Sequence, residues 1–103
     1  MKSNQDEFDV LRHIYKKPDS SQRELAKNLG FSLGKLNYCL NELKLKVLVK
    51  IQNFKKNKKK VNYIYILTPR GLAQKTKLTI NFMKRKMKEF DELKKELKNE
   101  KFD

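Results

Sequence analysis

The chain has 103 residues, of which 26 are lysine or arginine and 12 are aspartate or glutamate, so its formal net charge is +14. This length fits one domain, and the positive charge favours nucleic acid as a partner over an anionic membrane or an acidic protein. No stretch approaches the ~20 apolar residues of a membrane span, and the polar, acidic residues 1–9 do not resemble a signal peptide. A single cysteine, Cys39, excludes an internal disulfide, so we expect a cytoplasmic protein.

Two helices are predicted in the first thirty residues. Apolar residues recur at helical spacing over residues 5–15, and Pro18 ends that pattern. A second helix starts at Ser21, which forms a capping box with Glu24, and it stops at Gly30, because glycine adopts a left-handed backbone at little cost. The inward residues of this second helix are predicted to be Leu25, Ala26 and Leu29.

A third helix and two strands are predicted next. Ser32 can cap the helix, and its inner face would carry Leu36, Cys39, Leu40 and Leu43. After this helix, the apolar residues recur at every second position. Alternation indicates one strand at Val47, Val49 and Ile51 and an antiparallel partner at Val61, Tyr63, Tyr65 and Leu67. Residues 54–60, which include five lysines, are predicted to form an exposed loop between these strands.

A long final helix is predicted to begin at Thr68 and Pro69, a capping threonine followed by proline at the first helical position. The pattern continues to about Asn99, which gives ~30 residues and a length of about 45 Å. The predicted fold is therefore mainly α with a small β-hairpin: a winged helix-turn-helix domain over residues 1–68 and a coiled-coil-like dimerisation helix over residues 69–103.

Residues 22–41 have the spacing of a helix-turn-helix. Ala26 allows the two helices to cross closely, and Gly30 suits the turn between them. The second helix of such a unit enters the major groove with its N-terminal residues near base edges. An ordinary helical pair in a small core is the alternative interpretation, and the net charge disfavours it. We expect DNA contacts from the helix starts and the recognition helix at Ser21, Gln22, Arg23, Ser32, Leu33, Gly34, Lys35, Asn37, Tyr38 and Asn41.

The lysine-rich segment is expected to contact DNA as a wing. Lysines at the tip of a hairpin neutralise phosphates and carry little sequence information. The alternative is a surface loop that only aids solubility. The residues assigned to this contact are Lys55, Lys56, Lys58, Lys59 and Lys60.

The long helix carries a largely apolar stripe at heptad spacing, formed by Thr76, Ile80, Met83, Met87, Phe90, Lys94 and Leu97 and widened by Leu72, Phe82 and Leu93. A helix this long exceeds the surface of so small a domain, and a second copy is the simplest partner for its stripe. Two alternatives are a helix folded back on its own domain and a membrane-surface helix, although the acids after Lys88 disfavour anionic lipid. The residues assigned to dimerisation are Leu72, Thr76, Ile80, Met83, Met87, Phe90 and Leu97.

The chain resembles MarR-type winged-helix transcriptional regulators, and more closely their short, exopolysaccharide-associated subgroup. The resemblance is carried by SQRELAKNLGFSLGKLNYCLNEL and by NFKKNKKKVNYIYILTPRGLAQKTKLTINFMKRKMKEFDELKKEL, with SLGKLNYCL and FMKRKM as the more specific parts. It implies a bacterial homodimer that reads DNA through residues 32–44 and a wing contact at residues 53–60. It also implies control of polysaccharide or cell-envelope genes.

Two departures from this family are visible. Val47 stands where winged helices often have glycine before the first wing strand, so we expect a different turn there. The chain also lacks the extra helices with which larger MarR-type proteins build a ligand cleft, so no small-molecule effector is expected.

Catalytic and metal-binding patterns are missing from the sequence. His13 and Cys39 are the only residues of their types, so neither a nucleophile with its base nor a zinc site can be assembled. We therefore expect a protein without enzymatic activity, metal or cofactor. Two functions remain open: a homodimeric, sequence-specific repressor, or a winged-helix interaction module or non-specific binder of nucleic acid.

Overall fold

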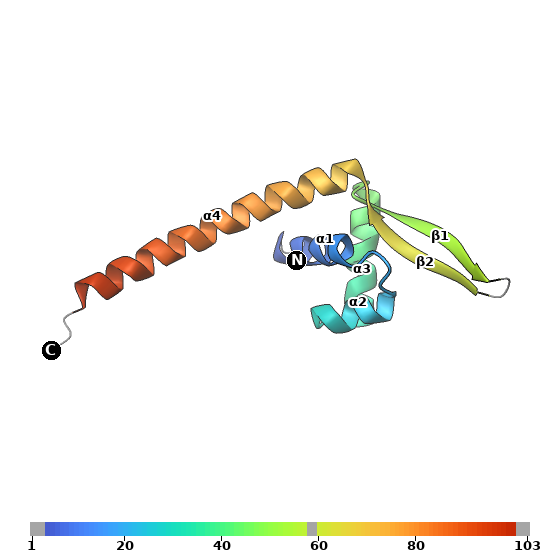
Figure 1. The fold of residues 1–103 in the computed structure, drawn as a ribbon, viewed down its shortest axis with the longest axis horizontal. Helices are drawn as coiled ribbons and strands as arrows, with labels where there is room; N and C mark the ends of the chain where they lie inside the picture. The colour runs from blue at the N-terminus through green and yellow to red at the C-terminus, as the bar shows by residue number, and fades with distance from the viewer. Residues whose placement is uncertain (1–3, 58–59, 101–103) are drawn as a thin grey trace.

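The computed structural model describes residues 4–57 and 60–100. The elements of this part of the chain follow the predicted order and confirm the winged-helix arrangement (Figure 1). The three short helices gather into one body, while the hairpin and the last helix project from it in different directions, so that the molecule measures 71 × 27 × 25 Å. The elements are α1 (Asn4–Lys16), α2 (Gln22–Leu29), α3 (Leu33–Leu45), β1 (Val49–Asn57), β2 (Lys60–Leu67) and α4 (Pro69–Asn99).

The predicted helix ends are confirmed by their hydrogen bonds. The Ser21 hydroxyl accepts from the backbone N–H of Glu24 at 3.1 Å, and the Ser32 hydroxyl accepts from that of Lys35 at 3.1 Å. Gly30 ends α2 in the left-handed conformation with φ of 70°. Each cap satisfies a backbone group that the helix leaves free, so the turn between α2 and α3 is defined by local chemistry.

The core lies between α1, α2 and α3 and continues beneath the start of the hairpin. The predicted inner face of α3 is buried throughout, and Leu25 and Ala26 of α2 are buried against it. A charged pair borders this core, where Lys46 Nζ lies 3.2 Å from the carboxylate of Glu7, whose side chain is only 5% exposed. The buried apolar residues are Phe8, Val10, Leu11, Ile14, Leu25, Ala26, Leu36, Cys39, Leu40, Leu43, Leu48, Val49 and Leu78.

The wing is longer than predicted. β1 and β2 pair antiparallel from Val49 opposite Leu67 to Asn57 opposite Lys60, with an irregularity between Lys55 and Asn57. The prediction of a loop over residues 54–60 was therefore wrong for most of that segment. β1 continues past Ile51, where its apolar alternation stops, because the backbone hydrogen bonds between paired strands do not depend on the type of side chain.

A hairpin–helix joint, formed by Val47, Leu48, Thr68 and Gly71, ties the wing to α4. The Thr68 hydroxyl caps α4 by accepting from the N–H of Gly71 at 3.0 Å, and it donates to the carbonyl of Val47 at 2.6 Å. The Thr68 N–H donates to the carbonyl of Leu48 at 3.0 Å. A Cβ atom on Gly71 would lie 1.9 Å from that same carbonyl oxygen, so only glycine allows this approach.

Val47 lies in a turn before β1, not in the strand where alternation placed it. Its φ of 60° is left-handed, a conformation that is unfavourable for a β-branched residue. The turn therefore keeps the backbone of a glycine-type turn although valine occupies the position, contrary to the expected difference. Its N–H donates to the carbonyl of Lys44 at 3.0 Å, and its own carbonyl accepts from Thr68, which holds the conformation in place.

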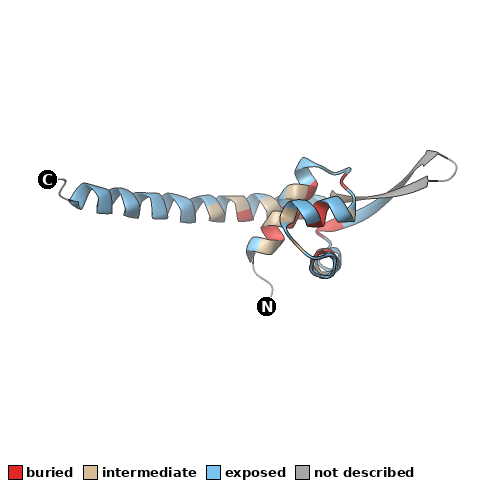
Figure 2. Cartoon of the chain, turned by 90° about the horizontal axis from the view of Figure 1, so that it is seen from below, coloured by how far each residue is buried: buried red, intermediate tan, exposed pale blue. Residues whose placement is uncertain are grey.

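The long helix packs on the domain only through its first half. Leu78 is buried, and the ring of Phe82 lies 5.4 Å from that of Phe8 in α1. The prediction that Phe82 widens the apolar stripe was thus wrong, because this side chain faces its own domain. Beyond Phe82 the helix is exposed on all sides (Figure 2), so in the single chain it does not fold back on the domain.

Candidate nucleic-acid interface

The start of α3 presents a polar surface that does not contribute to the core. All seven α3-side residues assigned to DNA contact are exposed, including Leu33 at 48% and Tyr38 at 57%. They alternate with the buried Leu36, Cys39 and Leu40, because the helical repeat separates an outer face from an inner one. Ser21 and Arg23 at the start of α2 are also exposed, whereas Gln22 is half-buried.

Lys35 has partners within the chain that sequence analysis did not foresee. Its Nζ lies 3.5 Å from the carboxylate of Asp6 in α1 and 4.2 Å from the centre of the Phe31 ring. Asp6 comes from a segment distant in sequence, so only the tertiary fold brings this acid to the start of α3. The ammonium group of this first-turn residue of α3 is thereby tied to α1 and to the ring of Phe31.

Two further predicted contact residues, Gln22 and Asn37, bond to each other. The side-chain amide of Gln22 donates to the side-chain oxygen of Asn37 and, at 3.2 Å, to the hydroxyl of Tyr65 in β2. This network connects α2, α3 and the wing, and it fixes the direction of the Asn37 side chain. Burial raises the pKa of Tyr65 above its ordinary value, while the hydrogen bond from Gln22 acts in the opposite direction. Alternation had placed Tyr65 in a strand but gave no sign of this contact.

Gly34 occupies the first turn of α3 without a packing reason for glycine. A Cβ atom at this position would meet no atom of the described chain within 4 Å, in contrast to Gly71. Glycine disfavours a helix by about 0.5–1 kcal/mol relative to alanine. The fold alone therefore gains nothing from glycine at position 34.

The structure describes only part of the wing segment that is predicted to contact DNA. Lys58 and Lys59 lie outside the described residues. For Lys55, Lys56 and Lys60 the backbone alone is described, and it lies in the outer part of the two strands. The pairing of β1 with β2 sets these positions near the end of the hairpin away from the core (Figure 1).

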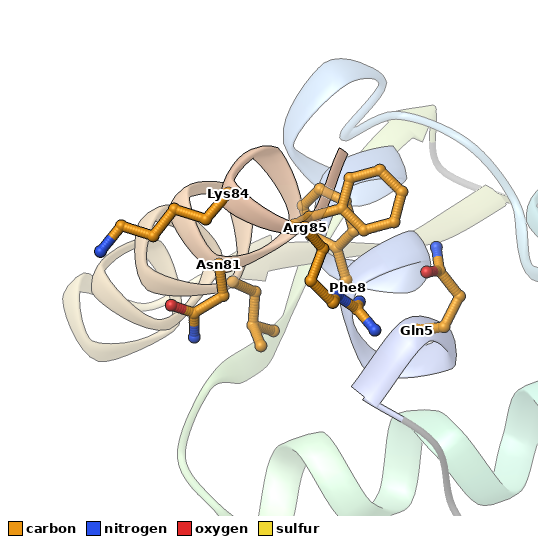
Figure 3. Close-up of a pocket in the computed structure, with 7 residues that line it drawn as sticks. Gln5, Phe8, Asn81, Lys84 and Arg85 are labelled. Carbon is orange, nitrogen blue, oxygen red and sulfur yellow. The ribbon is translucent and has the colours of Figure 1, made fainter. Parts of the chain in front are cut away.

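A groove of about 610 Å³ lies apart from this surface, between α1 and α4. Its lining includes Phe8 and Phe82. Gln5 and Phe8 line it from α1 and Arg85 from α4, while the Lys84 side chain extends away from α1 (Figure 3). Among the described residues, no cluster of three or more His, Cys, Asp or Glu side chains could hold a metal ion. Within the same part of the chain, none of the helices is long and apolar enough to cross a membrane.

A family model described as winged helix-turn-helix DNA-binding matches residues 7–46, which extend from α1 to the end of α3. This segment contains both helices of the helix-turn-helix and the turn at Gly30. No curated protein matches the chain. The family match thus covers α1 to α3 and does not include the wing or α4.

Solved structures of MarR-family regulators share the fold. MarR of Staphylococcus aureus, in complex with salicylate and kanamycin, has a TM-score of 0.69 at 17% identity, over 84% of this chain and 57% of its own. A cysteine-to-serine mutant of Escherichia coli MarR with operator DNA has a TM-score of 0.61 at 27% identity, over 71% of this chain and 51% of its own. The S. aureus MepR–DNA complex has a TM-score of 0.69 at 18% identity, over 94% of this chain and 74% of its own.

The chain spans little more than half the length of the two MarR structures. The matched parts cover 71–94% of this chain. The chain therefore has the winged helix-turn-helix fold of the MarR-family DNA-binding regulators.

Proposed function

We infer that this protein is a homodimeric, sequence-specific transcriptional repressor that acts by occupying a pseudo-palindromic DNA site. Each α3 would enter one of two successive major grooves, whose centres lie about 34 Å apart. The observation that carries this proposal is the exposed polar face at the start of α3, which includes a glycine that the fold does not require.

The side chains of this face suit base recognition. An asparagine amide can pair with the N6 and N7 edge of adenine, and Asn37 and Asn41 lie one helical turn apart on the exposed surface. Lys35 can donate to guanine O6 or N7 once it leaves Asp6. Their ion pair is partly exposed, with Lys35 at 48%, and such pairs contribute only about 0–1 kcal/mol, so the exchange costs little.

The net charge of +14 supports binding to the DNA backbone. The wing would follow the phosphates beside each half-site through its lysines, Lys55, Lys56, Lys58, Lys59 and Lys60. If a dimer neutralises ~8 phosphates through its wings and helix starts, the slope of log affinity against log salt concentration should be about −7. The resemblance seen in the sequence supports polysaccharide or cell-envelope genes as the targets.

Exposed apolar residues along α4 support the homodimer. Met87 and Phe90 are 63% and 64% exposed in the single chain. Met83, Leu93 and Leu97 of the same helix are also more than half exposed. Large side chains in such a row are unfavourable in water unless another surface covers them. A second copy would bury both rows at once.

The decisive experiment measures binding to a site selected from random duplexes and to an unrelated duplex, over a series of salt concentrations. Lys35→Ala should reduce the preference for the selected site, because base contacts carry specificity. Lys58→Ala should weaken binding to both duplexes by a similar factor. Lys95→Ala removes the same charge from an exposed position of α4 outside its apolar stripe, in the part of the helix that does not pack on the domain, and serves as the matched control.

The second candidate function gives a different result. A non-specific nucleic-acid binder or a protein-interaction module would bind both duplexes equally or neither. Equal affinity of the wild-type chain for all duplexes would contradict sequence-specific regulation. Unchanged preference in Lys35→Ala would contradict the role assigned to this lysine.

A further inference from the structure

The α4 helix carries its exposed apolar residues on the side away from its own domain. The apolar stripe consists of Leu72, Thr76, Ile80, Met83, Met87, Phe90 and Leu97, all of which are exposed. At 3.6 residues per turn, the centre of this stripe lies roughly 140° around the helix from the buried Leu78. The stripe is thus free to meet another molecule while Leu78 and Phe82 remain packed on α1.

The spacing within the stripe is symmetric about position 85. Met83 and Met87 lie two residues to either side, and Ile80 and Phe90 lie five residues to either side. When two identical helices pair antiparallel about this point, Met83 faces Met87 of the second copy and Ile80 faces Phe90. A parallel pair would instead set each residue against itself. This spacing permits a two-fold axis perpendicular to the helix, and a parallel pair has the same heptad spacing, so the charges and the groove described next decide the direction.

The charges of α4 are unevenly distributed along its length. Its acids, Glu89, Asp91, Glu92 and Glu96, all follow Lys88. The preceding twenty residues carry cations without a single acid, namely Arg70, Lys75, Lys77, Lys84, Arg85, Lys86 and Lys88. Parallel pairing would align these cations with their own copies at a helix separation of about 8–10 Å. Antiparallel pairing about position 85 also brings Lys84, Arg85 and Lys86 against the same residues of the second copy. It differs from the parallel pair at the acids, which come opposite residues 74–81 of the other helix, a stretch with Lys75 and Lys77 and no acid, although Lys94, Lys95 and Lys98 stand among these acids.

An apolar groove lies where the stripe begins. It has a volume of about 420 Å³ and is lined mainly by Ile14, Tyr15, Pro18, Leu67, Pro69 and Leu72. Leu72 belongs to both the groove and the stripe, so the two surfaces are continuous. In the antiparallel register just described, Leu97 of the second copy comes opposite residues 72 and 73. The end of the second α4 thus reaches the edge of this groove.

We propose that two copies pair antiparallel through α4, with the C-terminal end of each helix covering the apolar groove of the other copy. This proposal rests on the proposed homodimer and adds its direction and register. It sets the two domains at opposite ends of the helix pair. The residues around position 76, where α4 meets its domain, would then lie ~27 Å apart along the axis, a separation comparable to the ~34 Å between successive major grooves.

Disulfide crosslinking of the full chain distinguishes the two directions. The variants are Ile80→Cys and Phe90→Cys, each examined alone and then co-expressed as two chains of which one carries a size tag. Cys39 is buried and serves as the internal control in the wild type. A disulfide requires Cα atoms within about 7 Å. Antiparallel pairing predicts crosslinked dimers between Ile80→Cys and Phe90→Cys chains, and little or none in either variant alone.

Each other outcome has a definite meaning. Efficient crosslinking of each single variant with itself would establish a parallel pair, which overturns this proposal but leaves the homodimer intact. A dimer by analytical ultracentrifugation that crosslinks in no combination would also overturn the antiparallel register. A wild-type chain that sediments as a monomer at micromolar concentration would contradict the homodimer of the proposed function itself.

Discussion

Replacing Gly34 by alanine should separate the requirements of folding from those of DNA binding. The added methyl group would meet no atom of the described chain within 4 Å, so no packing cost is expected. Alanine favours the helix by about 0.5–1 kcal/mol. For a domain of this size, that gain corresponds to an increase in Tm of roughly 2–8 °C. Thermal unfolding followed by circular dichroism measures it.

The same methyl group should weaken DNA binding. If the backbone at Gly34 approaches the duplex closely, an extra methyl group overpacks that contact, typically at a cost of about 1–3 kcal/mol. We expect a loss of affinity of about tenfold, which corresponds to ~1.4 kcal/mol, in a fluorescence anisotropy titration with the selected site. A variant that is more stable and binds DNA like the wild type would refute the close approach.

Gly71→Ala provides the matched control for this substitution. The chemical change is the same, but here the methyl group would lie 1.9 Å from the carbonyl oxygen of Leu48. A backbone atom cannot move aside as a flexible side chain can, so we expect a loss of about 3 kcal/mol in the free energy of unfolding. If both glycine variants changed stability in the same direction, the local geometry described here would be wrong.

Two other predictions concern stability. Val47→Gly should raise the free energy of unfolding by about 1 kcal/mol, because glycine removes the cost of a left-handed valine and the 56% exposed side chain gives up little packing; urea unfolding of both proteins tests this, and a loss of stability would contradict it. Because the pKa of Tyr65 is raised in the folded chain, the unfolded chain releases the phenolic proton at a lower pH than the folded chain does. The protonated hydroxyl therefore contributes to stability at neutral pH, and this contribution is lost above about pH 10. The wild type should therefore lose stability more steeply than Tyr65→Phe across that range, and parallel pH profiles would refute the assignment.

Local signals were sufficient to predict most of the fold. The capping residues Ser21, Ser32 and Thr68 and the glycine at position 30 define helix ends through bonds to near neighbours, so the sequence contains the whole interaction. The buried face of α3 followed from its helical period. These elements could be predicted because every group involved lies within a few residues of its partner.

Contacts between distant segments could not be predicted in this way. Lys35 meets Asp6, and Gln22 meets Tyr65, only after the helices and the hairpin have packed together. Phe82 fits an apolar stripe by its spacing, yet it packs on Phe8 of α1. The length of the wing was also missed, since backbone pairing continues without an apolar pattern. The roles of the α3 face, the wing lysines and the α4 stripe remain predictions.

The hairpin–helix joint makes the geometry of a dimer sensitive to one small region. Thr68 and Gly71 fasten the first turn of α4 directly to the backbone that follows α3. A change in tilt of about 5° there would displace the far end of the ~46 Å helix by about 4 Å. In the proposed antiparallel pair, where the two domains lie ~27 Å apart along the axis, the same tilt would shift a domain by about 2 Å, which is more than half of the ~3.4 Å between successive base pairs. The precision with which two α3 helices could match successive grooves would thus depend on a threonine and a glycine that are not among the residues assigned to DNA contact.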